Sequence, residues 1–561
     1  MKKHRLLTLF IAACFALSVF SSIGLASTET AHAETKTLDI YAINDFHGAV
    51  DKMPQIAGYL AARKSEGAVI VNSGDMFQGS MESNSNYGRL LTECMDLAGF
   101  DAFTFGNHEF DWGLDNLRNL ARSSNVPFLG ANIYNWNANT RTWGEFASDL
   151  AQPYTVVEAD NLKVGIIGII GKDQITSISS QLVQTVGFKD PKDIVPNLSN
   201  KLRNEENCDA VIVSAHTGQD TFFSDDSWDI TQYADAVMCA HTHQAEMQIK
   251  NGVPFIQGAA NGNYVSHVRL SLDGNGNVQC DTYENISYSR LSTNVDNAVK
   301  SDVQAKIDNS NAAIESERTQ VLATLSGGYL NSSTAVPRLV CHAIAEYATS
   351  RGYAIDLAMV NNARSSLSQG NITYTSLYNA IPFDNVVYIA KVSGRDILNE
   401  ANYSSTGIWR VTGNIISNSN YSYYTIAVID YLLFHQNVNR NYNYFRSAFE
   451  SGFTPVALEK EGVEMYNYRL ITRDFLLKTG SINASTYTGN NIHTDKSQLT
   501  SRVDLPTFSE GTAPGATSPA QTPSNSGLPV YAIVLIVVGA VLVVAAAVAV
   551  TVVLTHRKRA K

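Results

Sequence analysis

The sequence lacks the features that mark disulfide-stapled, nucleic-acid-binding or repeat proteins. Its six cysteines are too few and too scattered for a disulfide framework in 561 residues, so hydrophobic cores must hold the fold. The formal net charge is −11, which argues against binding of nucleic-acid polymers through a basic surface. No internal repeat is visible. A free nucleotide or another small phosphate ester stays open as a ligand, because a local metal site can attract it against a negative overall charge.

Both ends of the chain carry targeting patterns. Residues 1–33 combine a basic start, an apolar middle and Ala31-His32-Ala33, which predicts a cleaved secretory signal, with an uncleaved anchor as the alternative. Residues 530–554 contain no charged side chain and predict a transmembrane helix, preceded by a flexible Ser/Thr/Pro-rich stalk at 506–529. The tail at 555–561 is basic and belongs on the cytoplasmic side. We therefore expect a single-pass cell-membrane protein with its folded domains outside, as on a Gram-positive cell surface.

The part between these patterns is too long for one core, which predicts two domains. In residues 34–292, short apolar runs alternate with helical patterns, which is typical of an α/β layered domain; the strand candidates are 37–43, 68–71, 164–170, 210–213 and 236–239. One apolar stripe over 295–325 predicts a helix that connects the domains, within a segment at 293–327. A smaller α+β domain, rich in tyrosine and asparagine, is expected at 328–505.

Polar clusters of metal-ligand type follow the predicted strands or a short apolar run. They contain Asp45, His47, Asp75, Asn107, His216, His241 and His243. Residues just past the carboxyl ends of parallel strands converge on one crevice. Imidazole and carboxylate suit zinc, manganese or iron, and seven ligands are enough for two ions that each keep an open position. Singly, each residue has a plainer reading as a turn residue, a helix cap or a surface pair.

Taken together, these clusters resemble the calcineurin-like metallophosphoesterases. The resemblance rests on Asn44-Asp45-Phe46-His47-Gly48, Ser73-Gly74-Asp75, Gly106-Asn107-His108-Glu109-Phe110-Asp111, His216 and His241-Thr242-His243. More narrowly, residues 38–502 resemble the secreted 5′-nucleotidases, which include UDP-sugar hydrolases and ecto-5′-nucleotidases. The resemblance implies a four-layer α/β/β/α domain followed by a substrate-binding domain, and two divalent ions, zinc first, with manganese, iron or cobalt as alternatives.

The resemblance also implies a role for each residue of the first domain. Asp45, His47, Asp75 and His243 would hold one ion, and Asp75, Asn107, His216 and His241 the other, with Asp75 bridging. A metal-activated water would attack phosphorus in line with the ester oxygen. His108 would face the phosphate as a cation or proton donor, and Asp111 would hold its ring. Ala240 stands where the family has glycine, and it would crowd a turn that needs positive φ.

Substrate choice is expected in the second domain. Phe383 follows Pro382 in the family's base-stacking motif, with an ordinary core residue as the alternative. Asn361-Asn362-Ala363-Arg364 replaces a glycine-rich family segment, which nominates Asn361 for substrate binding and Arg364 for a phosphate contact. The family's late glycine-rich motif is missing. Tyr442 or Tyr444 would supply a second stacking face there, or both would be surface tyrosines.

We therefore expect an extracellular, membrane-anchored hydrolase of nucleoside 5′-monophosphates, with a nucleotide as partner, no nucleic-acid polymer, and an open oligomeric state. A 2′,3′-cyclic-nucleotide phosphodiesterase with 3′-nucleotidase activity, or a UDP-sugar hydrolase, would use the same metal core. A non-catalytic surface binding module is the more remote alternative. Such a module would have lost metal ligands, whereas all seven are present.

Overall fold

The computed structural model describes residues 35–505, apart from 138–139, 180–181, 225–226, 275, 435, 438–441, 444, 462, 464–465 and 490. The predicted signal peptide, stalk, transmembrane helix and basic tail lie outside the described residues. Within the described ranges, no helix is both long and apolar enough to cross a membrane. The described residues up to Leu505 form one compact unit, in which two lobes can be distinguished by their hydrophobic cores.

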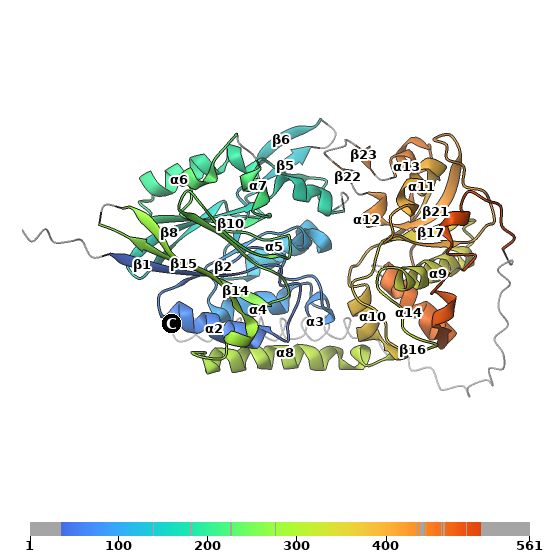
Figure 1. The fold of residues 1–561 in the computed structure, drawn as a ribbon, viewed down its shortest axis with the longest axis horizontal. Coiled ribbons are helices and arrows are strands. Elements are labelled where there is room, and N and C mark those ends of the chain that lie inside the picture. The colour runs from blue at the N-terminus through green and yellow to red at the C-terminus, as the bar shows by residue number, and fades with distance from the viewer. Residues whose placement is uncertain are drawn as a thin grey trace, which may run out of the picture. The chain divides into compact units, whose positions relative to one another are not determined.

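Two six-stranded sheets lie face to face in the first lobe, which ends with helix α8 (Figure 1). In spatial order, the first sheet contains β15 (Val278–Ser287), β14 (Tyr264–Leu272), β1 (Lys36–Ile43), β2 (Val69–Asn72), β3 (Ala102–Thr104) and β4 (Phe128–Leu129). The second contains β12 (Ala245–Lys250), β13 (Val253–Gly258), β11 (Ala236–Met238), β10 (Ala210–His216), β8 (Leu162–Ile170) and β7 (Tyr154–Ala159). A smaller sheet joins β6 (Thr142–Phe146), β5 (Ile133–Asn137) and β9 (Val186–Phe188).

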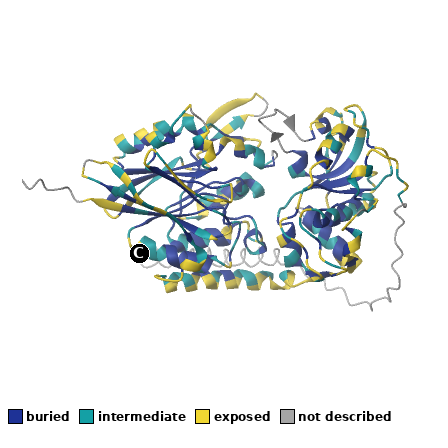
Figure 2. Ribbon diagram, viewed as in Figure 1, coloured by how far each residue is buried: buried dark blue, intermediate teal, exposed yellow. Residues whose placement is uncertain are grey.

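Branched apolar side chains such as Ile40, Val71, Ile166 and Ile212 fill the space between the two large sheets. Helices cover the outer faces: α2 (Met53–Ser65), α4 (Arg89–Ala98) and α5 (Gly113–Ser123) belong to the first sheet's side, and α6 (Val195–Asn204) packs on the second. The layers therefore run helix, sheet, sheet, helix, as Figure 2 also shows by the dark, buried strands. Short helices α3 (Met81–Asn84) and α7 (Asp220–Phe223) lie in connections.

The strands that carry the predicted site run parallel within each sheet. β1, β2, β3 and β4 are parallel neighbours, and so are β8, β10, β11 and β13. All five strands predicted from the sequence are present, with ends that shift by up to three residues. Parallel strands bring their carboxyl ends to one edge, so the polar residues that follow them gather there.

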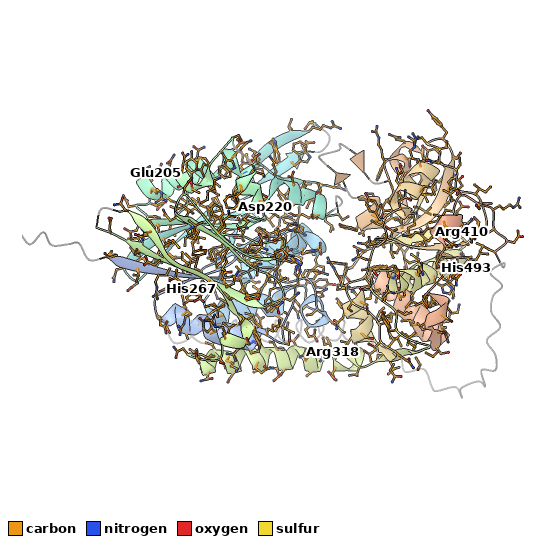
Figure 3. All side chains as sticks on the ribbon, viewed as in Figure 1. Glu205, Asp220, His267, Arg318, Arg410 and His493 are labelled. Carbon is orange, nitrogen blue, oxygen red and sulfur yellow. The ribbon has the colours of Figure 1, made fainter. Side chains whose placement is uncertain are left out.

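The predicted connecting helix is shorter than expected. Helix α8 covers Asn297–Arg318, and the chain then forms strand β16 (Val321–Ser326), so the helical prediction to residue 325 was wrong at its end. The apolar stripe was read correctly: only Val303 and Ile307 are buried, and the helix lies along α2 and α4. At its end, Arg318, which is labelled in Figure 3, pairs with Glu82 of α3 at 3.2 Å.

The second lobe has its own core, to which β16 already belongs. Its main sheet contains β20 (Gly407–Arg410), β17 (Leu357–Val360), β21 (Tyr423–Ile429), β19 (Val387–Ser393) and β24 (Val456–Ala457), and a second sheet joins β18 (Gly370–Thr373), β16 and β25 (Ser481–Asn483). The helices are α9 (Ala335–Ser350), α10 (Tyr374–Ala380), α11 (Gly394–Ala401), α12 (Asp430–Leu433), α13 (Ser447–Glu450) and α14 (Tyr468–Thr479). β17 and β21 are parallel, so this lobe too has strand ends that share an edge.

Candidate active site

The seven side chains predicted as metal ligands lie together at the carboxyl edges of the two large sheets. Six of them form two groups of three, and within each group the ligand atoms lie within 4.8 Å of one another. One group contains Asp45, His47 and His243, and the other contains Asp75, His216 and His241. The seventh, Asn107, joins the second group. The two groups correspond to the division that the resemblance implied.

In the first group, polar atoms of ligand type are held close together. Nε2 of His47 and Nε2 of His243 lie 3.0 Å apart, and Nε2 of His243 lies 3.4 Å from Oδ1 of Asp45. Asp45 is fully buried, and its Oδ1 accepts no hydrogen bond from the described residues. A buried carboxylate oxygen without a partner is costly, and a cation at this point would satisfy it.

In the second group, Oδ1 of Asn107 lies 3.2 Å from Nε2 of His216 and 3.1 Å from Nδ1 of His241. Oδ2 of Asp75 lies 3.3 Å from Nε2 of His216 and 3.9 Å from Nε2 of His47. This carboxylate oxygen thus lies between the two groups. A single carboxylate in that place suits the bridging ligand of a two-ion site.

Backbone carbonyls fix the tautomers of two histidines. Nδ1 of His47 faces the carbonyl oxygen of Gln78 at 3.1 Å, and Nδ1 of His216 faces that of Ser73 at 2.8 Å. A proton on each Nδ1 leaves the Nε2 lone pair directed at the site, which is the usual outer-shell arrangement of metal-binding histidines. Burial also lowers the pKa of His47 and that of His241 to about 4, so both rings are neutral ligands at neutral pH.

The backbone at the site is strained. Asp45, His47, Asp75, His241 and His243 have φ values between +46° and +79°, a region that side chains other than glycine rarely adopt. Strain of this kind persists where the surroundings impose it, and it gathers at ligand sites. Ala240 is not among the positive-φ residues, so the expected crowding at that position was wrong: the left-handed turn falls on His241 instead.

A glycine allows the close approach of the two sheets. Gly74 has a φ of +99°, and a Cβ atom there would lie 2.6 Å from Nδ1 of His216. Together with the unpartnered Asp45 oxygen, the opposed nitrogens and the N,O donor set, the residues fit two divalent ions of the zinc, manganese or iron type.

His108 and Asp111 form a pair on the 3₁₀ helix His108–Trp112, beside the metal groups. Nδ1 of His108 lies 2.8 Å from Oδ2 of Asp111, and the backbone N–H of His108 donates to Oδ1 of Asp75 at 2.9 Å. Burial opposes the charged form of His108, but the charges of Asp111 and Asp75 outweigh it and raise its pKa to about 9. The ring is therefore held in place and can donate a proton or a hydrogen bond.

Glu109 has a supporting role that sequence reasoning missed. It is fully buried, and its carboxylate accepts the backbone N–H groups of Asp75, Met76 and Gly106 at 2.7–2.9 Å. The carboxylate thereby ties the turn after β2 to the turn after β3. Its place directly after His108 was the available signal, because a buried carboxylate in a turn has to find backbone donors.

A cavity of about 350 Å³ opens in front of the metal groups and is lined by both lobes. From the first lobe come Asp75, Asn107, His108, Asp111, His241 and His243, and from the second Asn361, Asn362, Arg364, Phe383, Asp384, Asn385, Asp430 and Tyr431, among others. Asp45, His47 and His216 are not part of the cavity wall. The cavity lies within the volume range of small-molecule pockets.

The predicted substrate residues Arg364, Phe383 and Asn361 all line this cavity. The ring of Phe383 is half-buried and stacks on His108 with centroids 5.5 Å apart and planes 20° apart. The guanidinium of Arg364 lies over the same ring at 4.9 Å from its centroid. An aromatic face and a cation therefore stand directly beside the proposed phosphate position.

Of the two tyrosines predicted further along the chain, Tyr444 lies outside the described residues. Of Tyr442, only the backbone is described, in strand β23 (Tyr442–Asn443), which pairs with β22 (Gln436–Asn437). The cavity instead contains Tyr431 and Asp430, which sequence reasoning missed. They follow β21 directly, so the strand-end rule that found the ligands of the first lobe would also have found them. Burial raises the pKa of Asp430 to about 7.

The chain's similarity to known families agrees with this geometry. Residues 38–245 match the calcineurin-like phosphoesterase family, and residues 316–407 match the 5′-nucleotidase C-terminal domain. The chain thus combines a calcineurin-like phosphoesterase domain with a 5′-nucleotidase C-terminal domain. A 5′-nucleotidase of Thermus thermophilus has the same fold, with a TM-score of 0.62, 15% identity, and coverage of 80% of this chain and 97% of that one.

Its curated relatives carry several names. A 5′-nucleotidase of Vibrio parahaemolyticus is 23% identical over 476 residues, 71% of this chain and 80% of that protein. An endonuclease of Bacillus subtilis, YhcR, is 25% identical over 416 residues, 67% of this chain but only 33% of its own length. A cell wall protein of Listeria monocytogenes is 23% identical over 457 residues, 67% of this chain and 57% of its own length. The relatives thus include one that is named as a cell wall protein, and the others are named for different activities.

Proposed function

We propose that this metallophosphoesterase is a 5′-nucleotidase that hydrolyses nucleoside 5′-monophosphates to a nucleoside and phosphate. The observation that carries the proposal is the cavity in which Phe383 and Arg364 lie directly beside His108 and the metal groups. A volume of about 350 Å³ suits a mononucleotide rather than a polymer.

In this proposal, each residue of the candidate site has a defined task. The two ions, when bound by the seven ligands, supply an activated water and neutralise charge on the phosphoryl oxygens. His108 donates a hydrogen bond or a proton to the phosphate, and Asp111 holds its ring at 2.8 Å in the required orientation. Arg364 contacts the phosphate as a bidentate donor, and Asn361 contributes an amide to substrate binding.

Phe383 stacks on the nucleobase, and Tyr431 takes the task that was predicted for Tyr442 or Tyr444. Both rings line the cavity, and either presents a flat face to a base of any sequence. The proposal therefore places the chemistry in the first lobe and the recognition of the base in the second.

Purified protein tested on AMP, 3′-AMP, 2′,3′-cyclic AMP and UDP-glucose provides the decisive experiment. We expect the highest kcat/KM for AMP and a loss of at least about 100-fold in the His108→Ala variant, since general acid catalysis contributes about 10²–10⁴-fold. Slow AMP hydrolysis beside fast hydrolysis of the cyclic nucleotide would overturn the choice of substrate. A His108→Ala variant as active as the parent would remove His108 from the proposed chemistry, and a parent that hydrolyses none of the four substrates would revive a non-catalytic binding module.

A second candidate has a specific observation in its favour. The segment 361–364 keeps Arg364 but lacks the glycines of the resembled family, and the relatives include an endonuclease. A 2′,3′-cyclic phosphodiesterase with 3′-nucleotidase activity, or a UDP-sugar hydrolase, would retain the same metal groups. The same panel of substrates distinguishes these activities.

We further propose that the enzyme is exported and anchored by residues 530–554, so that it dephosphorylates external nucleotides for uptake of the nucleosides. Its signal-like start, its apolar segment and a relative named as a cell wall protein support this location. We propose zinc as the first choice of ion. Accessibility of the protein to protease on intact cells tests the location, and metal analysis of purified protein tests the ion.

A further inference from the structure

The loop that carries Phe383, residues 381–384, is bound tightly to its own lobe by one buried arginine. Arg469 is 4% exposed and donates to the carbonyl oxygens of Ile381, Pro382 and Phe383 at 3.2, 2.8 and 2.8 Å. It also pairs with the carboxylate of Asp384. We call residues 381–384 the Phe383 loop. Because four of its groups share one guanidinium, this single side chain links the whole loop to the second lobe.

The first lobe binds the same loop at two points. Nε2 of Gln78 and Nδ2 of Asn84 both donate to the carbonyl oxygen of Pro382, at 3.2 and 3.1 Å. Nε1 of Trp112 donates to Oδ2 of Asp384 at 3.1 Å. Asp384 thus contacts both lobes, because its other carboxylate oxygen, Oδ1, pairs with Arg469 and accepts a hydrogen bond from Nδ2 of Asn467 at 2.9 Å.

Both connections begin at the catalytic machinery. The carbonyl oxygen of Gln78 faces Nδ1 of His47 at 3.1 Å, so one residue contacts a proposed metal ligand and the loop. Trp112 directly follows Asp111 and ends the 3₁₀ helix that begins at His108. The distance between His108 and Phe383, 5.5 Å between ring centroids, is therefore held by the hydrogen bonds that Gln78 and Trp112 make to the loop.

A second cavity lies beside Asp384, on the side of the loop away from the metal groups. This cavity of about 580 Å³ is lined by Trp112, Asp384 and Arg469, among others, and Asp384 lines the substrate cavity as well. Trp112 itself is not part of the wall of the substrate cavity. Its indole touches the ring of Tyr87 edge to face, at 5.8 Å between centroids.

We propose that the hydrogen bond from Trp112 to Asp384 makes the enzyme selective for short substrates. It fixes the Phe383 loop directly beside His108, with the two ring centroids 5.5 Å apart, so that the proposed base site on Phe383 stays next to the proposed phosphate site at His108. A nucleotide sugar or a dinucleotide fits only when the loop withdraws, and the withdrawal breaks this bond. Trp112 is a positioning residue, and the inference rests on the proposed nucleotidase function.

The Trp112→Phe variant tests this inference, because it removes the N–H donor and part of the indole but keeps an aromatic ring, and its matched control loses the same atoms. We expect the ratio of kcat/KM for AMP to that for UDP-glucose to fall by about tenfold, since hydrogen bonds to charged groups contribute about 1.5–3 kcal/mol. The loss should lie in KM for AMP, with kcat within about twofold, because a positioning contact acts on uniform binding. Trp143→Phe is the matched control. Trp143 is 45% exposed on β6, and the variant should leave the ratio unchanged.

Two further variants separate selectivity from a general loss of stability. Gln78→Met removes one of the two first-lobe donors to the carbonyl oxygen of Pro382 without changing Trp112, and it should lower the ratio in the same direction by a smaller factor. In an Asp384→Asn background, Trp112→Phe should have a smaller effect on the ratio than in the parent, because directly contacting residues are not additive. Melting temperatures of all variants identify any that do not fold, and the ratio is then taken from the others.

The outcomes distinguish the selective role of the Trp112 contact from the proposed nucleotidase function. If the parent hydrolyses AMP best but the ratio stays the same in Trp112→Phe and in Gln78→Met, the selective role of this contact is wrong while the nucleotidase function stands. If the parent prefers UDP-glucose, the proposed nucleotidase function is wrong, and the selection of short substrates falls with it.

Discussion

Asp430 is a carboxyl group in the substrate cavity that the protein holds in its protonated form up to neutral pH. Burial raises its pKa from 3.8 to about 7, and the charges of Asp111 and Asp384 act in the same direction. The backbone N–H of Tyr431 donates to its Oδ1 at 2.7 Å, which lowers the pKa but does not outweigh burial. No lysine or arginine among the described residues pairs with it.

The sign of the effect on stability follows from proton binding. Between pH 4 and 7, the folded protein keeps the proton of Asp430 while the unfolded chain releases it, so the folded state binds more protons and its stability falls as pH rises. The loss begins near the unfolded pKa of 3.8 and is complete above the folded pKa of about 7. A difference of about 3 units corresponds to about 4 kcal/mol, of which about 3 kcal/mol develop between pH 5 and pH 8.

The Asp430→Asn variant removes the titrating group and keeps its shape. We compare the free energy of unfolding of the variant with that of the parent, both from urea unfolding. We expect the difference, variant minus parent, to be larger at pH 8 than at pH 5 by about 3 kcal/mol. The metal ligands titrate in both proteins and cancel in the comparison. Asp302→Asn, at an exposed position on α8, is the control. A difference between Asp430→Asn and the parent that stays constant from pH 5 to pH 8 would refute the assignment of a raised pKa to Asp430.

Three further predictions concern the metal groups, the stacking ring and the supporting carboxylate. Removal of metal with a chelator should lower the melting temperature and abolish hydrolysis, and added zinc should restore both. The reason is that an ion that binds only the folded state, present at 100 times its Kd, stabilises that state by about 2.7 kcal/mol. An unchanged melting curve would argue against bound ions. Phe383→Ala should raise KM for AMP by about 5- to 150-fold while Phe383→Tyr should not, because stacking on a base is worth about 1–3 kcal/mol; equal KM values would remove Phe383 from the base site. Glu109→Gln should cost about 1–3 kcal/mol of stability, measured by urea unfolding, because an amide accepts the three backbone N–H groups less well than a carboxylate does; a stability equal to the parent's would contradict the tie between the two turns.

Much of the first lobe could be predicted, because its strands are apolar runs and its candidate site residues follow the ends of these strands. Apolar runs predicted β1, β2, β8, β10 and β11, and the rule that ligands gather at the carboxyl ends of parallel strands placed seven polar residues at one edge. The same rule, applied to β21, would have found Asp430 and Tyr431. Tyr442 and Tyr444 were predicted instead, because they lie where the resembled family has its glycine-rich motif.

Other features could not be predicted because they depend on contacts between distant segments. The hydrogen bond between Trp112 and Asp384 joins residues 272 positions apart, and no local pattern indicates that they meet. The end of α8 was misplaced because an apolar stripe continues into β16, where the buried residues Leu322, Ala323 and Leu325 belong to the core of the second lobe. Helical and strand periods are hard to separate over so short an apolar run.

The left-handed backbone of the ligand residues explains why metal binding and folding should be linked in this protein. Asp45, His47, Asp75, His241 and His243 all adopt positive φ, at a cost of the order of 1 kcal/mol each. The unpartnered buried oxygen of Asp45 adds to that cost. Two bound ions would give this oxygen a partner and would offset the cost of the strained turns. The hydrogen bonds of Glu109 and Asn44, which hold the turns in place, therefore preorganise a site whose stability depends on its ions.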